Sequence, residues 1–202
     1  MVSGRTTVIA HRSSVYPGVR PDAYVGTVGR AASFELVAVD WDANLLAGQV
    51  VQIELVERRW YSVQEQDAQG RIRWTSSVEE IPVVGPEELI SSADGKAEFS
   101  FIPPKGGVYK ARVTTVDARG NVARAAAYMW VAGDEFIPWR QTNDRSFELV
   151  ADRQIYKPGD TAEILVASPF EGPAYALVTV ERGRIRFQEV ILLENNSTLY
   201  PL

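Results

Sequence analysis

The stretch KGGVYKARVTTVDARGNVARAAAYMWV, residues 105–131, decides the fold of this chain. Apolar and polar side chains alternate along 108–116 and again along 123–131, which is the pattern of strands that bury one face. Arg119-Gly120-Asn121 separates the two runs, and Lys105-Gly106-Gly107 precedes the first. Glycine supplies the positive φ angles that tight turns need. We therefore expect two strands of an antiparallel sheet here.

The same alternation recurs along the rest of the chain. It covers the runs 6–11, 33–40, 49–56, 96–101, 147–151, 162–167, 174–180 and 187–193. The nearest helix candidate, 85–90, is too short to propagate as a helix on its own. Short strands separated by turn residues at this spacing predict an all-β protein built from antiparallel sandwiches.

The alternation lapses over 133–144, which predicts a linker between two modules. The first module, 5–132, has seven or more expected strands, enough to close an immunoglobulin-like or fibronectin III-like sandwich. Within it, the acidic stretch 61–95 resembles an insertion and predicts an extra hairpin and a loop. Such a loop is either a binding element or, more simply, a spacer.

The second module, 145–202, offers only four or five strands, so we expect it to be incomplete. The missing strands either follow residue 202 in the natural chain or come from a partner. An uncovered sheet edge also predicts that two copies can pair through it.

Composition excludes several classes of function. The 202 residues carry a formal net charge of −5, whereas nucleic-acid binders need a basic face. There is no cysteine, so disulfides, thiolate metal ligands and a thiol nucleophile are excluded. No apolar run is long enough to cross a bilayer, and no export signal follows Met1. If the natural protein is exported, its signal lies elsewhere.

The residues that could carry chemistry are few. His11 is the only imidazole, and its place at the end of an expected strand favours a structural role over a catalytic one. The run 40–44, Asp-Trp-Asp-Ala-Asn, begins like a calcium loop, but Leu45 and Val51 stand where that loop needs glycine and glutamate. Two carboxylate pairs, Glu54 with Glu57 and Glu79 with Glu80, lack a spacing that favours sugar hydrolysis. We predict no enzyme activity and no catalytic, cofactor or metal site, and leave ligand and interface residues open.

Five tryptophans offer a carbohydrate-stacking platform or, more simply, core and interface material: Trp41, Trp60, Trp74, Trp130 and Trp139. Trp139 follows Pro138 in the expected linker, and we predict that it wedges between the modules and fixes their orientation. Asn195-Asn196-Ser197-Thr198 contains two overlapping glycosylation sequons, which we interpret as a turn between strands.

The second module contains the motifs Tyr156-Lys157-Pro158-Gly159-Asp160-Thr161-Ala162, Ser168-Pro169-Phe170 and Ala176-Leu177-Val178-Thr179-Val180-Glu181-Arg182-Gly183. The first module contains the motifs 39–42, 55–60, 101–109 and 117–121. The motifs of the second module resemble the start of the bait-bearing module of bacterial α-2-macroglobulins, and those of the first module resemble the module before it. Tyr109 resembles the tyrosine of a tyrosine corner, whose hydroxyl bonds back to the preceding loop.

The resemblance implies structural modules of a large protease trap, in which cleavage of a bait segment makes the assembly of modules collapse around the protease. It implies as partners the other macroglobulin domains of the same chain and the target proteases, and a periplasmic, extracellular or cell-envelope location. The absence of cysteine departs from the thioester of many members. The alternative is a stand-alone adhesion or carbohydrate-binding sandwich that uses its tryptophans and the stretch 61–95.

Overall fold

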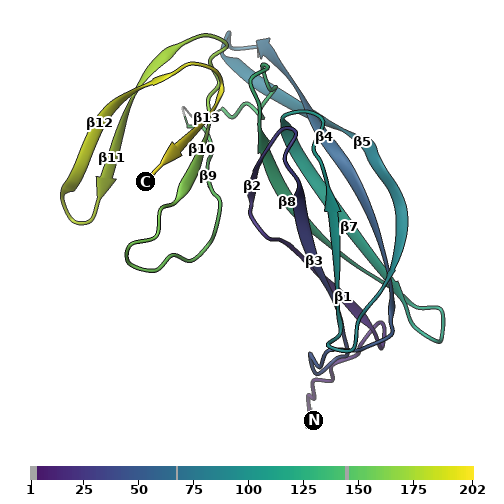
Figure 1. Ribbon diagram of the computed structural model, residues 1–202. Helices are drawn as coiled ribbons and strands as arrows, with labels where there is room; N and C mark the ends of the chain where they lie inside the picture. The colour runs from purple at the N-terminus through teal and green to yellow at the C-terminus, as the bar shows by residue number, and fades with distance from the viewer. Residues whose placement is uncertain (1–3, 67, 144–145) are drawn as a thin grey trace.

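The computed structural model describes residues 4–66, 68–143 and 146–202. These residues form thirteen β-strands in four sheets and no helix. The described part of the chain therefore contains no helix that could cross a membrane. Figure 1 shows two groups of strands side by side, β1 to β8 in one and β9 to β13 in the other. The all-β class expected from the alternation is confirmed.

The first group is a sandwich of two sheets. One sheet has the order β1-β3-β6, with β1 at Tyr16–Pro21, β3 at Ala32–Val39 and β6 at Lys96–Phe101. The other has the order β2-β8-β7-β4-β5, with β2 at Val25–Thr27, β8 at Val122–Ala132, β7 at Gly107–Val116, β4 at Val50–Gln66 and β5 at Ile72–Ile90. The pairs are antiparallel except β2 with β8, which is parallel, so the wholly antiparallel expectation was wrong at this edge.

The core between these sheets comes from the inward positions of the alternating runs. Every second residue of β3 is buried, and Phe34, Leu36, Ile53 and Leu55 are fully enclosed. Tyr109 lies among them, and its hydroxyl donates a hydrogen bond to the carbonyl of Lys105 at 2.8 Å. Burial raises the pKa of Tyr109 to about 12. The predicted tyrosine-corner contact is confirmed.

Alternation was misleading at the N-terminus. Residues 6–11 form no strand, and the side chains of Val8 and Ile9 are more than four-fifths exposed. Among the described residues no strand pairs with this run, and a strand alone cannot satisfy its backbone groups. β1 was missed because it contains Pro17 and Gly18, which weaken a strand signal but are tolerated at the edge of a sheet.

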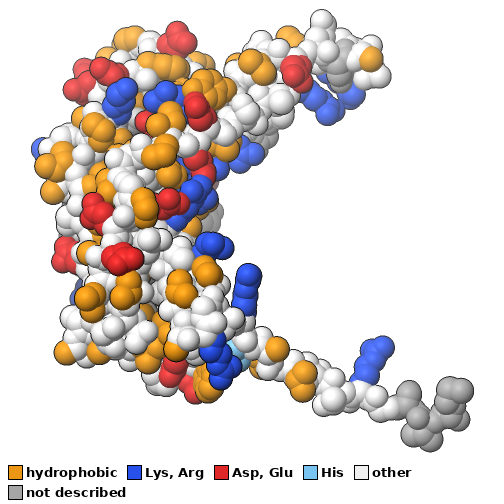
Figure 2. All heavy atoms as spheres, turned by 90° about the vertical axis from the view of Figure 1, so that its right-hand side faces the viewer, with side chains coloured by type: hydrophobic (Ala, Val, Ile, Leu, Met, Phe, Trp, Pro, Cys, Tyr) orange, Lys and Arg blue, Asp and Glu red, His pale blue; other side chains and the backbone are white. Residues whose placement is uncertain are grey.

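β4 and β5 form one long hairpin, paired from Val50 with Ile90 to Gln66 with Ile72. The stretch 61–95 therefore holds the far end of β4, the turn and all of β5, including the residues 85–90 weighed as a helix. Figure 2 shows the tip of this hairpin projecting from the body at the upper right, and the N-terminal segment projecting below.

The second group is more open. β9 (Leu149–Ala151), β10 (Glu163–Ala167) and β13 (Ser197–Pro201) form a sheet of order β13-β10-β9. β11 (Ala174–Glu181) and β12 (Ile185–Leu193) form a separate hairpin. Between the two lies an apolar groove of about 370 Å³, and Leu149 and Leu177 on its walls are 63% and 64% exposed.

Candidate functional site

A second hydrophobic cluster joins the two groups of strands. This junction cluster consists of Val25, Val108, Ala132, Ile137, Trp139, Val150, Leu165 and Ala167. Its members come from β2, β7 and β8 on one side, from β9 and β10 on the other, and from the connecting segment between β8 and β9. Trp139 is only 6% exposed and packs with residues of both groups, so its predicted position is confirmed, while its effect on their orientation stays a prediction. Burying a side chain of this size stabilises the contact by about 1.5–3 kcal/mol.

Hydrogen bonds of Asn196 hold the connecting segment against the second group. Its side chain is buried; its amide Nδ2 donates to the carbonyl of Ile137 at 2.6 Å and its Oδ1 accepts the Ile137 N–H at 3.1 Å. The indole Nε1 of Trp139 donates to the Asn196 carbonyl at 2.6 Å. The Gly133 N–H donates to the Ser197 hydroxyl at 3.2 Å. Because its amide is buried and bonded, Asn196 is not accessible for glycosylation in this fold.

The tip half of the β4–β5 hairpin braces the same segment from the first group. Asn143 pairs with the backbone of Trp74, accepting its N–H at 2.6 Å and donating to its carbonyl at 3.0 Å. The Gln141 carbonyl accepts a hydrogen bond from the Ser76 hydroxyl at 3.2 Å. The connecting segment is thus held from both sides, and the long hairpin is part of the junction.

A third connection runs from β2 to the end of β9. The Tyr24 N–H donates to the carbonyl of Asp152 at 2.8 Å, and Gln154 donates to the Tyr24 hydroxyl at 2.9 Å. Burial opposes ionisation of the Asp152 carboxyl, but hydrogen bonds from the Tyr156 hydroxyl and the Glu163 N–H outweigh it and lower its pKa. The ionised carboxylate thereby orders the loop that meets the first group.

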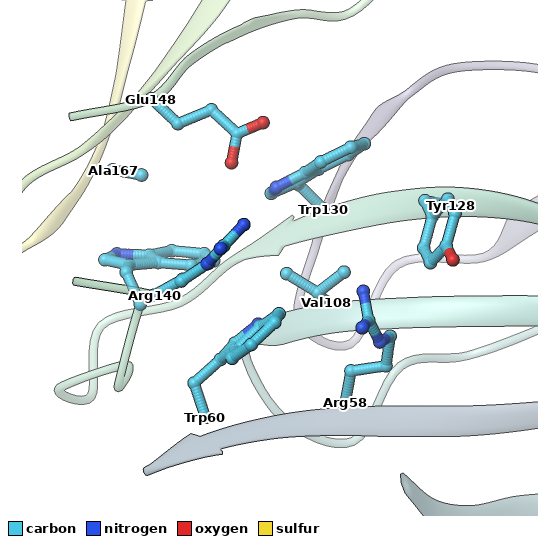
Figure 3. A pocket seen from close by; sticks show the side chains of 9 residues that line it. Arg58, Trp60, Val108, Tyr128, Trp130, Arg140, Glu148 and Ala167 are labelled. Carbon is cyan, nitrogen blue, oxygen red and sulfur yellow. The ribbon is translucent and has the colours of Figure 1, made fainter. Parts of the chain in front are cut away.

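A pocket of about 330 Å³ opens beside the junction cluster, on the outer face of the five-stranded sheet. It is lined by Arg58, Trp60, Val108, Tyr128, Trp130, Trp139, Arg140, Glu148 and Ala167. Figure 3 shows Trp60 between the side chains of Arg58 and Arg140. Three of the five tryptophans therefore meet here, whereas Trp41 is an exposed loop residue and Trp74 lies on the hairpin.

The arginines of this pocket rest on its aromatic rings. The guanidinium carbon of Arg58 lies 4.9 Å from the Trp60 ring centre and 5.2 Å from that of Tyr128. That of Arg140 lies 5.3 Å from the Trp60 ring. The buried Nε of Arg58 has no hydrogen-bond partner among the described residues, because Glu80 is 3.6 Å away. Alternation along β4 does not predict this environment, because it cannot show which rings and strands lie beside Arg58.

The other residues considered for chemistry make structural contacts. His11 is exposed, with Nδ1 3.5 Å from the Tyr16 hydroxyl. Asp40 accepts the N–H groups of Asp42 and Asn44, both at 2.9 Å, and the side-chain amide of Asn44 lowers its pKa. These are the bonds of a polar turn. Within the described ranges, no group of three or more His, Cys, Asp or Glu side chains could hold a metal ion.

The carboxylate pairs do not converge. Glu54 accepts from Arg112 at 2.7 Å, and Glu57 accepts from Arg59 at 3.1 Å. Glu79 accepts from the Tyr61 hydroxyl at 2.8 Å. Glu80 accepts from Lys110 at 3.1 Å and forms an ion pair with Arg112. Each of these four carboxylates has a hydrogen-bond donor as its partner.

The motifs of the resemblance form tight turns. Gly159 adopts a φ of +93°, and Asp160 accepts the Lys157 N–H at 3.0 Å. Asp117 is buried, and the side-chain amide of Asn121, with the N–H of Ser14, holds the pKa of its carboxyl well below the usual range. These residues set the geometry of the turns.

Comparison with known proteins identifies the family of this chain. The family model "Bacterial macroglobulin domain 6" matches residues 18–133. The chain belongs to this bacterial macroglobulin family. An alpha-2-macroglobulin homolog of Nostoc is 29% identical over 174 residues, and the alpha-2-macroglobulin of Escherichia coli is 27% identical over 171 residues. These matches cover 86% and 80% of the macroglobulin chain described here. The resemblance predicted from the motifs is confirmed.

The fold of the macroglobulin chain is also found in a solved relative. The native conformation of E. coli alpha-2-macroglobulin matches 94% of it with a TM-score of 0.53 at 20% identity. The matched region is 13% of that structure. The chain spans about a tenth of the length of the curated relatives, 9% of the Nostoc protein and 10% of the E. coli protein.

Proposed function

We propose that these residues are two consecutive structural modules of a bacterial α-2-macroglobulin that inhibits proteases broadly by trapping them after bait cleavage. In this proposal residues 5–132 form one macroglobulin module, 133–144 the linker, and 145–202 the N-terminal part of the bait-bearing module. The chain itself is not an enzyme. Its partners are the other macroglobulin domains of the same protein and the target proteases, in the periplasm or cell envelope.

The observation that carries the proposal is the braced junction. A trap needs modules that move as units when a distant bond is cut, and a loose linker would absorb that movement. Here Trp139 is buried between the groups of strands, Asn196 holds the linker on one side and Asn143 holds it on the other. The names of the curated relatives and the family match support the same role.

The first experiment is an immunoblot of cytoplasmic and envelope fractions from the source organism, with an antibody raised against this chain. We expect an envelope band several times larger than 22.4 kDa that shortens after brief exposure to unrelated proteases. A band at 22.4 kDa would instead support a small stand-alone binding protein.

The role of the junction is tested in that full-length protein with Trp139→Ala, using Trp41→Ala, a change at an exposed loop residue, as the matched control. Both variants should be cut by trypsin at the wild-type rate. We expect the increase in native-gel mobility after cleavage to be reduced in Trp139→Ala alone. An unchanged mobility shift would mean that the junction does not transmit the cleavage.

A further inference from the structure

The pocket beside the junction cluster holds two guanidinium groups that lie over aromatic rings. Arg58 lies against Trp60 and Tyr128, and Arg140 lies against Trp60. A guanidinium over a ring is attracted to the ring without using its five N–H donors, which lie in the plane of the group and stay available for acceptors. Such donors fit a planar, bidentate acceptor.

These donors are poorly used by the protein itself. The Arg58 Nε is buried without a hydrogen-bond acceptor among the described residues, and its ion pair with Glu80 is long, at 3.6 Å. Among the described residues, no carboxylate forms an ion pair with Arg140 either. Glu148 lines the pocket, and its side chain points into it in Figure 3, but no ion pair or hydrogen bond joins it to either arginine.

The local charge differs from that of the whole chain. Around the pocket, Glu80 is shared by Arg58, Lys110 and Arg112, and Arg112 also binds Glu54. With Arg140 and Glu148 included, four cations face three carboxylates, which leaves one positive charge. The chain as a whole carries −5. The groups around the pocket therefore offer an anion a small positive excess.

We propose that this pocket is a binding site for a carboxylate carried on a flat or apolar body. The carboxylate would lie against the N–H edges of Arg58 and Arg140, and the body against Trp130 and Val108. A volume of about 330 Å³ is at the small end for ligand pockets, which fits one side chain or one small acid. Glu148 disfavours a doubly charged phosphate more than a singly charged carboxylate. The guanidinium groups that rest on Trp60 and Tyr128 leave less ring surface for sugar stacking.

Two sources carry this chemistry: a free small acid, or an acidic side chain in a peptide. The site is independent of protease trapping. It joins Arg58 of the first group to Arg140 of the linker, so a bound carboxylate would also tie the linker to the sheet.

The test uses the indole N–H signals of the five tryptophans in NMR spectra of the 202-residue protein. Benzoate should shift the signals of Trp60 and Trp130 in a saturable way, while Trp41 and Trp74 act as internal controls. Neutral benzamide and glucose should not shift them. A blocked glutamyl-phenylalanine dipeptide, compared with its glutaminyl counterpart, tests the peptide source. Binding of benzoate alone assigns the site to small acids, and binding of the dipeptide assigns it to peptides.

Variants separate the arginines from the apolar walls. We expect Arg58→Met and Arg140→Met each to weaken benzoate binding about tenfold, and Glu148→Gln to strengthen it a few-fold. Arg58→Lys, which keeps the charge but loses the fork, serves if Arg58→Met does not fold. Arg124→Met, at an exposed position of β8, should change nothing. Equal shifts with benzamide, equal shifts with sulfate, or no shift with any probe would each overturn the proposal.

Discussion

The two groups of strands bury their apolar residues to very different extents. In the first sandwich, two sheets enclose Phe34, Leu36, Ile53 and Leu55 completely. In the second group the sheet β13-β10-β9 and the hairpin β11–β12 leave an open groove, and large side chains such as Tyr175, at 81%, stay exposed. Two of its most buried residues, Leu165 and Ala167, belong to the junction cluster rather than to a core of its own. We therefore expect the order of the second group to depend on the first.

The largest expected effect comes from breaking the first sandwich. Phe34→Ala removes a fully buried ring from its centre and should lower the free energy of unfolding by about 3–5 kcal/mol. Because the second group depends on the first, amide protection should fall in both. Denaturant unfolding and hydrogen exchange measure the two effects. Protection kept in β10 and β13 while β3 unfolds would contradict the dependence.

Trp139→Ala should separate the groups instead of unfolding the first. It removes the wedge of the junction cluster, which we expect to cost the second group roughly 3 kcal/mol of stability. Hydrogen exchange should then become faster in β9, β10 and β13, with β3 and β7 unchanged. Trp41→Ala, at a side chain that is 59% exposed, should leave both groups as they are.

A smaller change removes the hydrogen bonds between the Asn196 side chain and Ile137. Asn196→Leu leaves the N–H and carbonyl of Ile137 without the side-chain partners they now have. Buried backbone groups in this state cost about 1–3 kcal/mol. We expect hydrogen exchange to become faster in β9, β10 and β13, as in Trp139→Ala, but to a smaller extent. A stability loss confined to the first sandwich would show that the Asn196 hydrogen bonds do not stabilise the junction.

The uncovered face of the second group could also associate with a second copy of the chain in solution. Our sequence prediction that its sheet edge pairs with a second copy stays a prediction. Sedimentation of the wild-type chain across a hundredfold range of concentration tests it, with Leu177→Lys as a variant that places charge on the exposed groove wall. A mass that stays monomeric throughout would remove the idea.

Period-two alternation predicted the strands that belong to a closed core, because burial on one face imposes that pattern directly, as in β3 and β7. It failed at 6–11, whose residues stay exposed, and at β1, where Pro17 and Gly18 weaken the signal of an edge strand. Trp139 was predictable from its place after Pro138 in the linker. Asn196 and Arg58 were not, because their roles depend on which distant backbone or ring lies beside them.

The smallest effect is expected at Tyr109, in the core of the first sandwich. Tyr109→Phe removes the hydrogen bond to the Lys105 carbonyl and should cost about 0.5–1.5 kcal/mol at neutral pH. Folding raises the pKa of Tyr109 from 10.0 to about 12, so its contribution is complete below pH 10 and is lost as pH rises toward 12.

Over that range the unfolded chain loses this proton before the folded chain does, which destabilises the wild type but not the variant. The stability difference between them should therefore shrink above pH 10 and then reverse. Other tyrosines with raised pKa values, Tyr156 and Tyr200, titrate in both proteins and cancel in the difference. A difference that stays constant from pH 8 to pH 12 would mean that Tyr109 is not desolvated, and that the sandwich is less tightly closed around it than its burial indicates.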